Sequence, residues 1–178
     1  MNSWTDGKRW SDQFVDQIKG IVGPLLFEQS SLYVDRNEAT DLVLRVRDLR
    51  IACRMRSWPY AAKYPYQFTM RAFTRNGALS EHQKFVDGFG DWMFYGYASE
   101  RGDGIGRYVV IDLKAWRSQR ITYRIAGDRH ANGDGTGLLA YDLRHFYAEP
   151  PLVVACSHPE IRVCYRYRPM GDLFADQA

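Results

Sequence analysis

Two neighbouring stretches of the chain, 41–47 and 50–56, alternate apolar and charged residues with a period of two. A pleated strand points successive side chains to opposite faces, so each stretch is predicted to be a strand with one apolar and one charged face. The apolar faces carry Leu42, Leu44, Val46, Ile51, Cys53 and Met55. The charged faces carry Asp41, Arg45, Arg47, Arg50, Arg54 and Arg56. The short connection at residues 48 and 49 predicts an antiparallel hairpin.

A third alternating stretch, 67–73, points Phe68 and Met70 to one face and Gln67, Thr69 and Arg71 to the other. If the three stretches are neighbours in one sheet, their arginines converge near Asp41. The function of the chain then depends on what this arginine cluster binds.

The remaining pattern predicts helices around further strands. Apolar residues recur every three or four positions between 8 and 20, which is typical of an amphipathic helix that covers one face of a sheet. Ser80 and Gln83 have the spacing of a capping box, and Asp112 is placed to cap a helix. Strands are predicted at 91–98, 107–113, 121–125, 138–147, 152–156 and 161–168, with polar or aromatic loops at 128–137 and 58–66. We therefore expect one mixed α/β or α+β domain over residues 1–178, with a central mixed sheet of five or more strands flanked by helices.

Composition narrows the class of protein. Hydrophobic residues make up 46% and charged residues 25%, which is typical of a globular chain. The net charge of +3 is too small for nonspecific coating of nucleic acid, so any such binding must come from local clustering. Three cysteines without a CxxC spacing argue against a disulfide framework and a zinc site. With no apolar leader and no run of membrane-span length, we expect a cytoplasmic protein that does not bind membranes.

Four motifs in order carry a family resemblance: A-T-D-L-V-L-R-V at 39–46, R-I-A-C-R-M-R at 50–56, Q-F-T-M-R at 67–71 and D-G-F-G-D-W-M-F-Y-G at 87–96. Together they resemble a family of small phage- and prophage-borne proteins related to the PD-(D/E)XK nuclease-like superfamily. The resemblance covers roughly residues 38–120 and implies a restriction-endonuclease-like core.

In that superfamily an Asp and a Glu-x-Lys pair hold a divalent metal that activates water. Asp41 matches the first position here, but Arg54 and Arg56 stand where the Glu and Lys belong. A guanidinium cannot ligate a metal, and two of them repel a cation. The resemblance therefore implies the fold more directly than the reaction.

A metal site could still form if other carboxylates replaced the missing glutamate. Candidates are Glu28, Glu81 and Asp91, with Lys84 one helical turn after Glu81 as the lysine. An active enzyme would then use Asp41, Glu81 and Lys84 for catalysis, and Asp41 and Glu28 as ligands of Mg²⁺ or Mn²⁺. In simpler interpretations, Glu81 stabilises a helix N-terminus and Lys84 forms a surface ion pair.

Three interpretations of the arginine cluster remain open. It is the solvated face of a sheet, a phosphate-binding face, or a buried network with Asp41, Glu81 or Asp91. The leading hypothesis is a phage or mobile-element protein that binds nucleic acid, DNA rather than RNA, on a nuclease-like scaffold with a degenerate or altered metal site. Its contacts would be Arg45, Arg47, Arg54, Arg56 and Arg71.

Two alternatives belong to other classes. One is a protein-binding factor, such as a counter-defence inhibitor of a host complex or a virion component, which would expose an aromatic patch near residues 58–66. The other is an active metal-dependent nuclease. A homo-oligomer is compatible with each of them.

Overall fold

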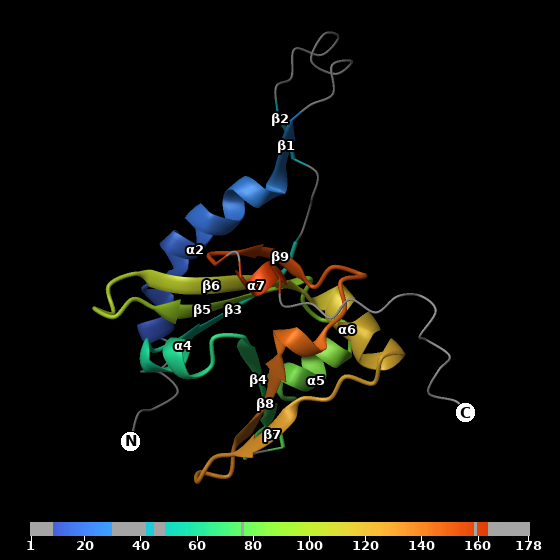
Figure 1. The fold of residues 1–178 in the computed structure, drawn as a ribbon. Helices are drawn as coiled ribbons and strands as arrows, with labels where there is room; N and C mark the ends of the chain where they lie inside the picture. Colours follow the sequence, from blue (N-terminus) through green and yellow to red (C-terminus); the bar gives the residue numbers. More distant parts are fainter. Residues whose placement is uncertain (1–8, 30–41, 45–48, 76, 159, 164–178) are drawn as a thin grey trace.

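The strands divide among three sheets in a computed structural model of the chain (Figure 1). The structure describes residues 9–29, 42–44, 49–75, 77–158 and 160–163. The largest sheet has the order β3-β5-β6-β9, formed by β3 (Ile51–Arg56), β5 (Trp92–Ala98), β6 (Ile105–Asp112) and β9 (Val153–Cys156). The second is β4 (Gln67–Phe73), β8 (Gly137–Asp142) and β7 (Asp128–Ala131) in the order β4-β8-β7. β1 (Phe27–Gln29) pairs only with β2 (Leu42–Leu44) within the described residues.

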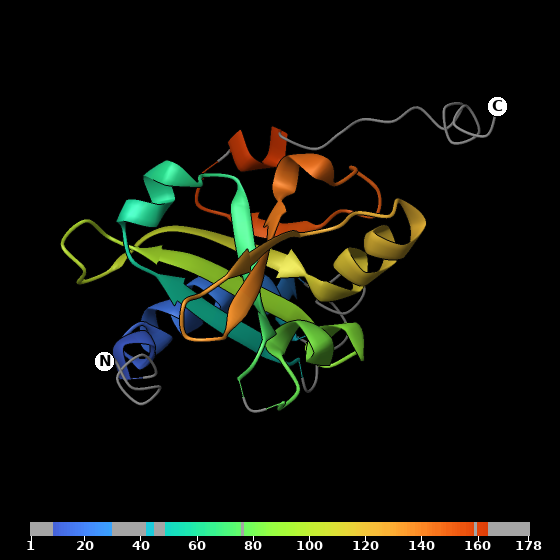
Figure 2. The ribbon, with the colours of Figure 1, turned by 90° about the horizontal axis from the view of Figure 1, so that it is seen from below.

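Helices cover both faces of the four-stranded sheet. α2 (Val15–Val22), followed by the 3-10 turn η1 (Gly23–Leu26), lies on one face, where Phe14, Ile18 and Val22 pack against Met55 and Phe94 (Figure 1). The second sheet crosses the other face, together with α4 (Pro59–Lys63), α5 (Glu81–Val86) and α6 (Leu113–Thr122) (Figure 2). The 3-10 turn η2 (Leu143–His145) follows β8, and α7 (Glu160–Val163) follows β9. Within the described ranges, no helix has the length and apolar character needed to cross a membrane.

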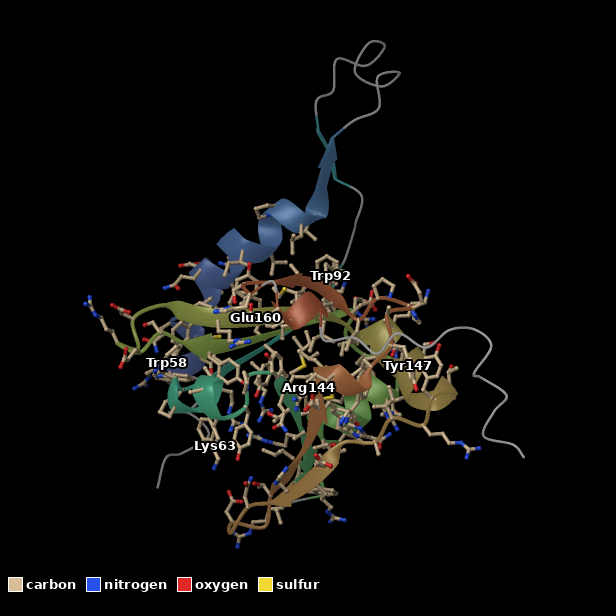
Figure 3. The ribbon with its side chains drawn as sticks, viewed as in Figure 1. Trp58, Lys63, Trp92, Arg144, Tyr147 and Glu160 are labelled. Carbon is tan, nitrogen blue, oxygen red and sulfur yellow. The ribbon has the colours of Figure 1, made fainter. Side chains whose placement is uncertain are left out.

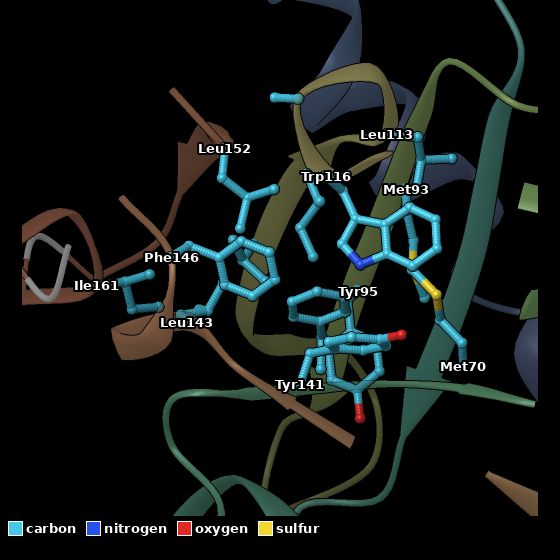
Figure 4. Packing of buried hydrophobic residues seen from close by; sticks show 14 of the residues in the cluster. Met70, Met93, Tyr95, Leu113, Trp116, Tyr141, Leu143, Phe146, Leu152 and Ile161 are labelled. Carbon is cyan, nitrogen blue, oxygen red and sulfur yellow. The ribbon is translucent and has the colours of Figure 1, made fainter. Parts of the chain in front are cut away.

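The main core lies between the two larger sheets and α6. Trp116 packs edge-on against Tyr141, with ring centroids 5.6 Å apart, and both are almost completely buried (Figure 4). Phe68 and Phe146 complete this aromatic group. Burying one such side chain stabilises the fold by about 1.5–3 kcal/mol, so the high aromatic content is largely explained by the core.

Both predicted helix caps are confirmed. The hydroxyl of Ser80 accepts a hydrogen bond from the Gln83 N–H at 3.1 Å. The Asp112 carboxylate accepts from the N–H groups of Lys114 and Ala115 at 2.7 and 2.8 Å. Each cap satisfies backbone donors that have no partner inside the helix.

The mixed α/β class is confirmed, but the expected central sheet of five or more strands is replaced by sheets of four and three strands. The predicted hairpin is wrong: β2 pairs with β1, whereas β3 runs parallel to β5. The described parts of the three alternating stretches therefore lie in three different sheets. Asp48 and Leu49 lack the Gly or Asn that a two-residue hairpin turn favours, and β5, buried on both faces, takes β3 as its edge neighbour instead.

Four smaller predictions also fail. α6 continues to Thr122, so residues 121 and 122 are helical; Ile121 is 78% exposed and marks no buried strand. Residues 161–163 belong to α7 rather than to a strand. The loop predicted at 58–66 contains α4, and the loop predicted at 128–137 begins with β7. A Cβ at Gly137 would lie 2.8 Å from the His130 carbonyl oxygen, so the close approach of β7 and β8 requires glycine there.

Candidate anion-binding site

Three residues lie side by side across the four-stranded sheet. Arg56 on β3 pairs in register with Tyr97 on β5, and Tyr97 pairs with Arg107 on β6. Residues in register point to the same face, here the face that the second sheet and α4 cover. We call Arg56, Tyr97 and Arg107 the Arg–Tyr row. The backbones of its two arginines are about 10 Å apart, which is two interstrand spacings.

Arg56 connects the row to α4. Its guanidinium carbon lies 4.3 Å from the centroid of the Tyr60 ring, a cation–π geometry. Its Nη1 lies 3.4 Å from the Thr69 hydroxyl, which in turn is 3.2 Å from the hydroxyl of Tyr95. Among the described residues, no carboxylate forms an ion pair with Arg56, whereas the charge of Arg54 is offset by Glu81.

Three aromatic side chains and one lysine lie on α4 and on the residues that flank it. Trp58 and Tyr60 are 36% and 41% exposed. The Tyr60 and Tyr64 rings are nearly parallel, at 16°, with centroids 6.4 Å apart, and Lys63 Nζ lies 5.2 Å from the Tyr64 centroid. We call Trp58, Tyr60, Lys63 and Tyr64 the α4 surface; Figure 3 labels Trp58 and Lys63 on it. This surface offers rings for stacking beside positive charges.

Tyr97 fixes the position of α4 relative to the sheet. Its hydroxyl lies 3.1 Å from each of the carbonyl oxygens of Tyr64 and Gln67, to which it donates. Burial raises the pKa of Tyr97, and the Tyr95 hydroxyl raises it further, although Arg56 and Arg107 act in the opposite direction. Tyr97 therefore stays a neutral hydrogen-bond donor that holds the two ends of the 64–67 connection.

Arg107 and Arg144 lie near one aromatic ring, that of Tyr66. Their guanidinium carbons are 6.0 and 5.1 Å from its centroid. Arg144 is bound by Asp142 through two nitrogens, Nε and Nη2. The Arg107 side chain is only 13% exposed, and its nearest ion-pair partner is Glu160 on α7, at 3.6 Å. Figure 3 labels Arg144 and Glu160.

Two of the carboxylates proposed for catalysis or metal binding, Glu81 and Asp91, are paired with arginines. Glu81 Oε2 accepts from Arg54 Nη1 at 2.7 Å and from the Arg71 N–H at 2.8 Å. Asp91 binds Arg50 through two nitrogens, and these hydrogen bonds lower the pKa of Asp91. Of the interpretations left open, the Arg–carboxylate network therefore describes Arg54, although this pair is only partly buried.

The other predicted site residues are scattered or lie outside the described residues. Lys84 is exposed on α5. Arg71 is exposed, and its charge acts on Asp134 in the turn between β7 and β8. Asp41, Arg45 and Arg47 lie outside the described residues, as does the side chain of Glu28, whose backbone pairs with Val43 in β1 and β2. Within the ranges that the structure describes, no group of three His, Cys, Asp or Glu side chains is placed to hold a metal ion.

The sequence interpretation missed Arg107, Tyr97 and Arg144. A signal for Arg107 was available, because it alternates with Val109 and Ile111, which are both buried in the main core. An arginine in register with core positions is expected to meet a specific partner or ligand. No such signal marked Arg144, whose place beside Tyr66 depends on how the second sheet crosses the first.

A second feature, on the opposite face of the four-stranded sheet, is apolar. A space of about 310 Å³ lies between α2 and β3, lined by Ile18, Lys19, Val22 and Cys53 among others. Burial raises the pKa of the Cys53 thiol, so it is not an activated nucleophile. Among the described residues that line this space Lys19 is the one that carries a charge, so the space does not resemble an anion site.

Comparison with known proteins adds no relative: no protein-family model, no curated protein and no solved structure matches this chain. The resemblance to phage-borne and nuclease-like proteins therefore remains a prediction from the four motifs. The site must be interpreted from its own geometry.

Proposed function

We propose that this chain binds nucleic acid, with the α4 surface and the Arg–Tyr row as its contact face. The observation that carries the proposal is the ordering of rings and charges: Arg56 lies on Tyr60, Tyr60 is parallel to Tyr64, and Lys63 lies over Tyr64. Proteins that bind single strands combine aromatic side chains, on which bases stack, with cations that follow the phosphates. Exposed rings can stack only on unpaired bases, which favours single-stranded segments over intact duplex.

Of the arginines predicted for binding, the proposal keeps Arg56 and adds Arg107. Arg54 is given a structural role because Glu81 already binds it. DNA rather than RNA, and a phage or mobile-element origin on a nuclease-like scaffold with an altered metal site, stay part of the proposal on the strength of the sequence motifs alone. Catalysis is not part of it.

Binding of a labelled single-stranded oligonucleotide, followed by fluorescence anisotropy, tests the proposal. Stacking of one base on an aromatic side chain contributes about 1–3 kcal/mol, so Tyr60→Ala should weaken binding about fivefold or more. Lys63→Gln should reduce the slope of log K against log salt by about 1.

Matched controls lie elsewhere on the surface. Phe89 is 56% exposed, and Lys114 is exposed at the start of α6. Phe89→Ala and Lys114→Gln should leave both affinity and salt slope unchanged. Equal losses in the control and test variants, or no oligonucleotide binding by the unaltered chain, would overturn the proposal.

The protein-binding alternative has one observation in its favour, the exposure of Trp58 and Tyr60 together. Such a pair can anchor a protein partner as well as a base. That alternative predicts that Trp58→Ala lowers the affinity for the protein partner, and that this affinity is nearly independent of salt concentration. A steep salt dependence for the natural ligand would instead favour nucleic acid.

A further inference from the structure

Two arginines of this chain bind carboxylates with the same edge of the guanidinium group. Arg50 donates from Nε at 3.1 Å and from Nη2 at 3.2 Å to the two oxygens of Asp91. Arg144 donates from Nε and Nη2 to Asp142, at 2.9 and 2.5 Å. Nε and Nη2 form two parallel donors that match the oxygen spacing of a carboxylate or phosphate.

At Arg107 the same edge is buried and has no acceptor. Nε and Nη2 are inaccessible to water, and neither has a hydrogen-bond partner in the part of the chain that the structure describes. Glu160 Oε1 approaches Nη2 only to 3.6 Å, beyond hydrogen-bond distance. Burying a charged donor without an acceptor costs free energy. An oxyanion bound at this edge would supply the missing acceptor.

The position of Glu160 shows how an oxyanion could reach Arg107. The Glu160 side chain is 48% exposed, while Ile161, the next residue on α7, is buried in the main core. The helix is therefore anchored, while the Glu160 carboxylate lies beside Nη2 of that edge and reaches solvent. Arg144, near the same Tyr66 ring, has Asp142 as a counter-ion.

We infer that the Nε–Nη2 edge of Arg107 binds a phosphate group, whose oxygens take the place of the Glu160 carboxylate. The inference rests on the proposed function, because the phosphate belongs to the strand that the α4 surface binds. The Arg–Tyr row places Arg107 on the same face as Arg56, two strands away. Glu160 then competes with the ligand for Arg107.

Two substitutions with opposite expected effects test the inference. Arg107→Gln removes the charged edge and should weaken oligonucleotide binding about tenfold or more. Glu160→Gln removes the competing charge and should tighten binding severalfold. Arg101→Gln, at an exposed turn position, removes a cation elsewhere and should match the unaltered chain. Because Arg107 is nearly buried, circular dichroism checks its folding, and the exposed Glu160→Gln provides an independent answer.

Oligonucleotides of one sequence with a 5′-phosphate or a 5′-hydroxyl identify the source of the phosphate. A preference for the phosphorylated form that disappears in Arg107→Gln supports a terminal phosphate at the edge. Equal weakening of both forms by Arg107→Gln supports a backbone phosphate. Oligonucleotide binding that neither Arg107→Gln nor Glu160→Gln changes overturns the inference and leaves the proposed function intact.

Thermal unfolding with inorganic phosphate distinguishes a failure of the proposed function from a failure of the inference about Arg107. If no oligonucleotide binds, but phosphate raises the melting temperature and Arg107→Gln abolishes this effect, the anion site stands and the proposed function fails. If phosphate and oligonucleotides both leave the unaltered chain unaffected, the inference is overturned together with the proposed function.

Discussion

At the scale of single residues, the arginines divide by what their guanidinium groups meet. Arg50, Arg54 and Arg144 each bind a carboxylate. Arg56 lies on an aromatic ring, and Arg107 has two buried donors without acceptors. The arginines of the first group have structural roles. Among the described residues, Arg56 and Arg107 have no carboxylate within hydrogen-bond distance and are available to bind an anion, and both are neighbours of Tyr97 in the Arg–Tyr row.

Asp142 provides a prediction about pH. Burial alone would raise the pKa of Asp142, but hydrogen bonds from the Arg144 side chain and N–H outweigh it, and the pKa lies below its usual value. A depressed pKa means that the carboxylate contributes stability at pH values above the unfolded pKa of about 3.9, and that this contribution is lost as the pH falls through the folded pKa. Asp142→Asn should therefore cost about 1–3 kcal/mol of unfolding free energy at pH 7 and progressively less below pH 4.

Urea denaturation at pH 7 and pH 3 measures both values. If Asp142→Asn is destabilising by the same amount at both pH values, the stabilisation does not come from the charge. If capping were the only contribution, the variant would lose little stability at either pH, because Asn can still accept the Arg144 N–H.

At the scale of elements, alternation in the sequence predicted strand faces well and strand partners poorly. It placed Arg54 and Arg56 opposite Met55, and the structure agrees, since Met55 packs under α2 while both arginines face the second sheet and its helices. Partners depend on contacts between distant residues. Arg54 meets Glu81 across 27 positions, and no local pattern encodes that distance.

Glu81 joins elements that belong to different sheets, and this gives a prediction about stability. It binds Arg54 of β3 and the backbone of Arg71 in β4 through one oxygen. Glu81→Ala leaves a half-buried guanidinium and a backbone N–H without their acceptor, so it should lower the unfolding free energy by about 1.5–3 kcal/mol. Lys84→Ala, on the exposed side of the same helix, should change it by less than about 0.5 kcal/mol.

A nuclease assay with Mg²⁺ or Mn²⁺ distinguishes a structural role of Glu81 from a catalytic one. If the role of Glu81 is structural, Glu81→Ala should lower the stability, and the unaltered chain should show no metal-dependent cleavage. Cleavage that requires the metal and disappears in Glu81→Ala at unchanged stability would return Glu81 to the catalytic role that the sequence suggested.

At the scale of the whole molecule, the site arises where the two larger sheets cross. The Arg–Tyr row comes from β3, β5 and β6, the rings come from α4, and Tyr66 and Arg144 come from segments that lead into or out of the second sheet. The sequence indicated an α/β chain with clustered arginines. It could not indicate the crossing of the sheets, which places Arg144 beside Tyr66 and Arg54 beside Glu81.

The most direct measurement is an NMR titration of the ¹⁵N-labelled chain with an unlabelled single-stranded oligonucleotide. The largest amide shift changes are expected in residues 56–66 and at Tyr97 and Arg107, at low salt, with smaller changes as salt is raised. Changes confined to α2 and the apolar space beneath it, or an absence of changes at every amide, would contradict binding through the α4 surface and the Arg–Tyr row.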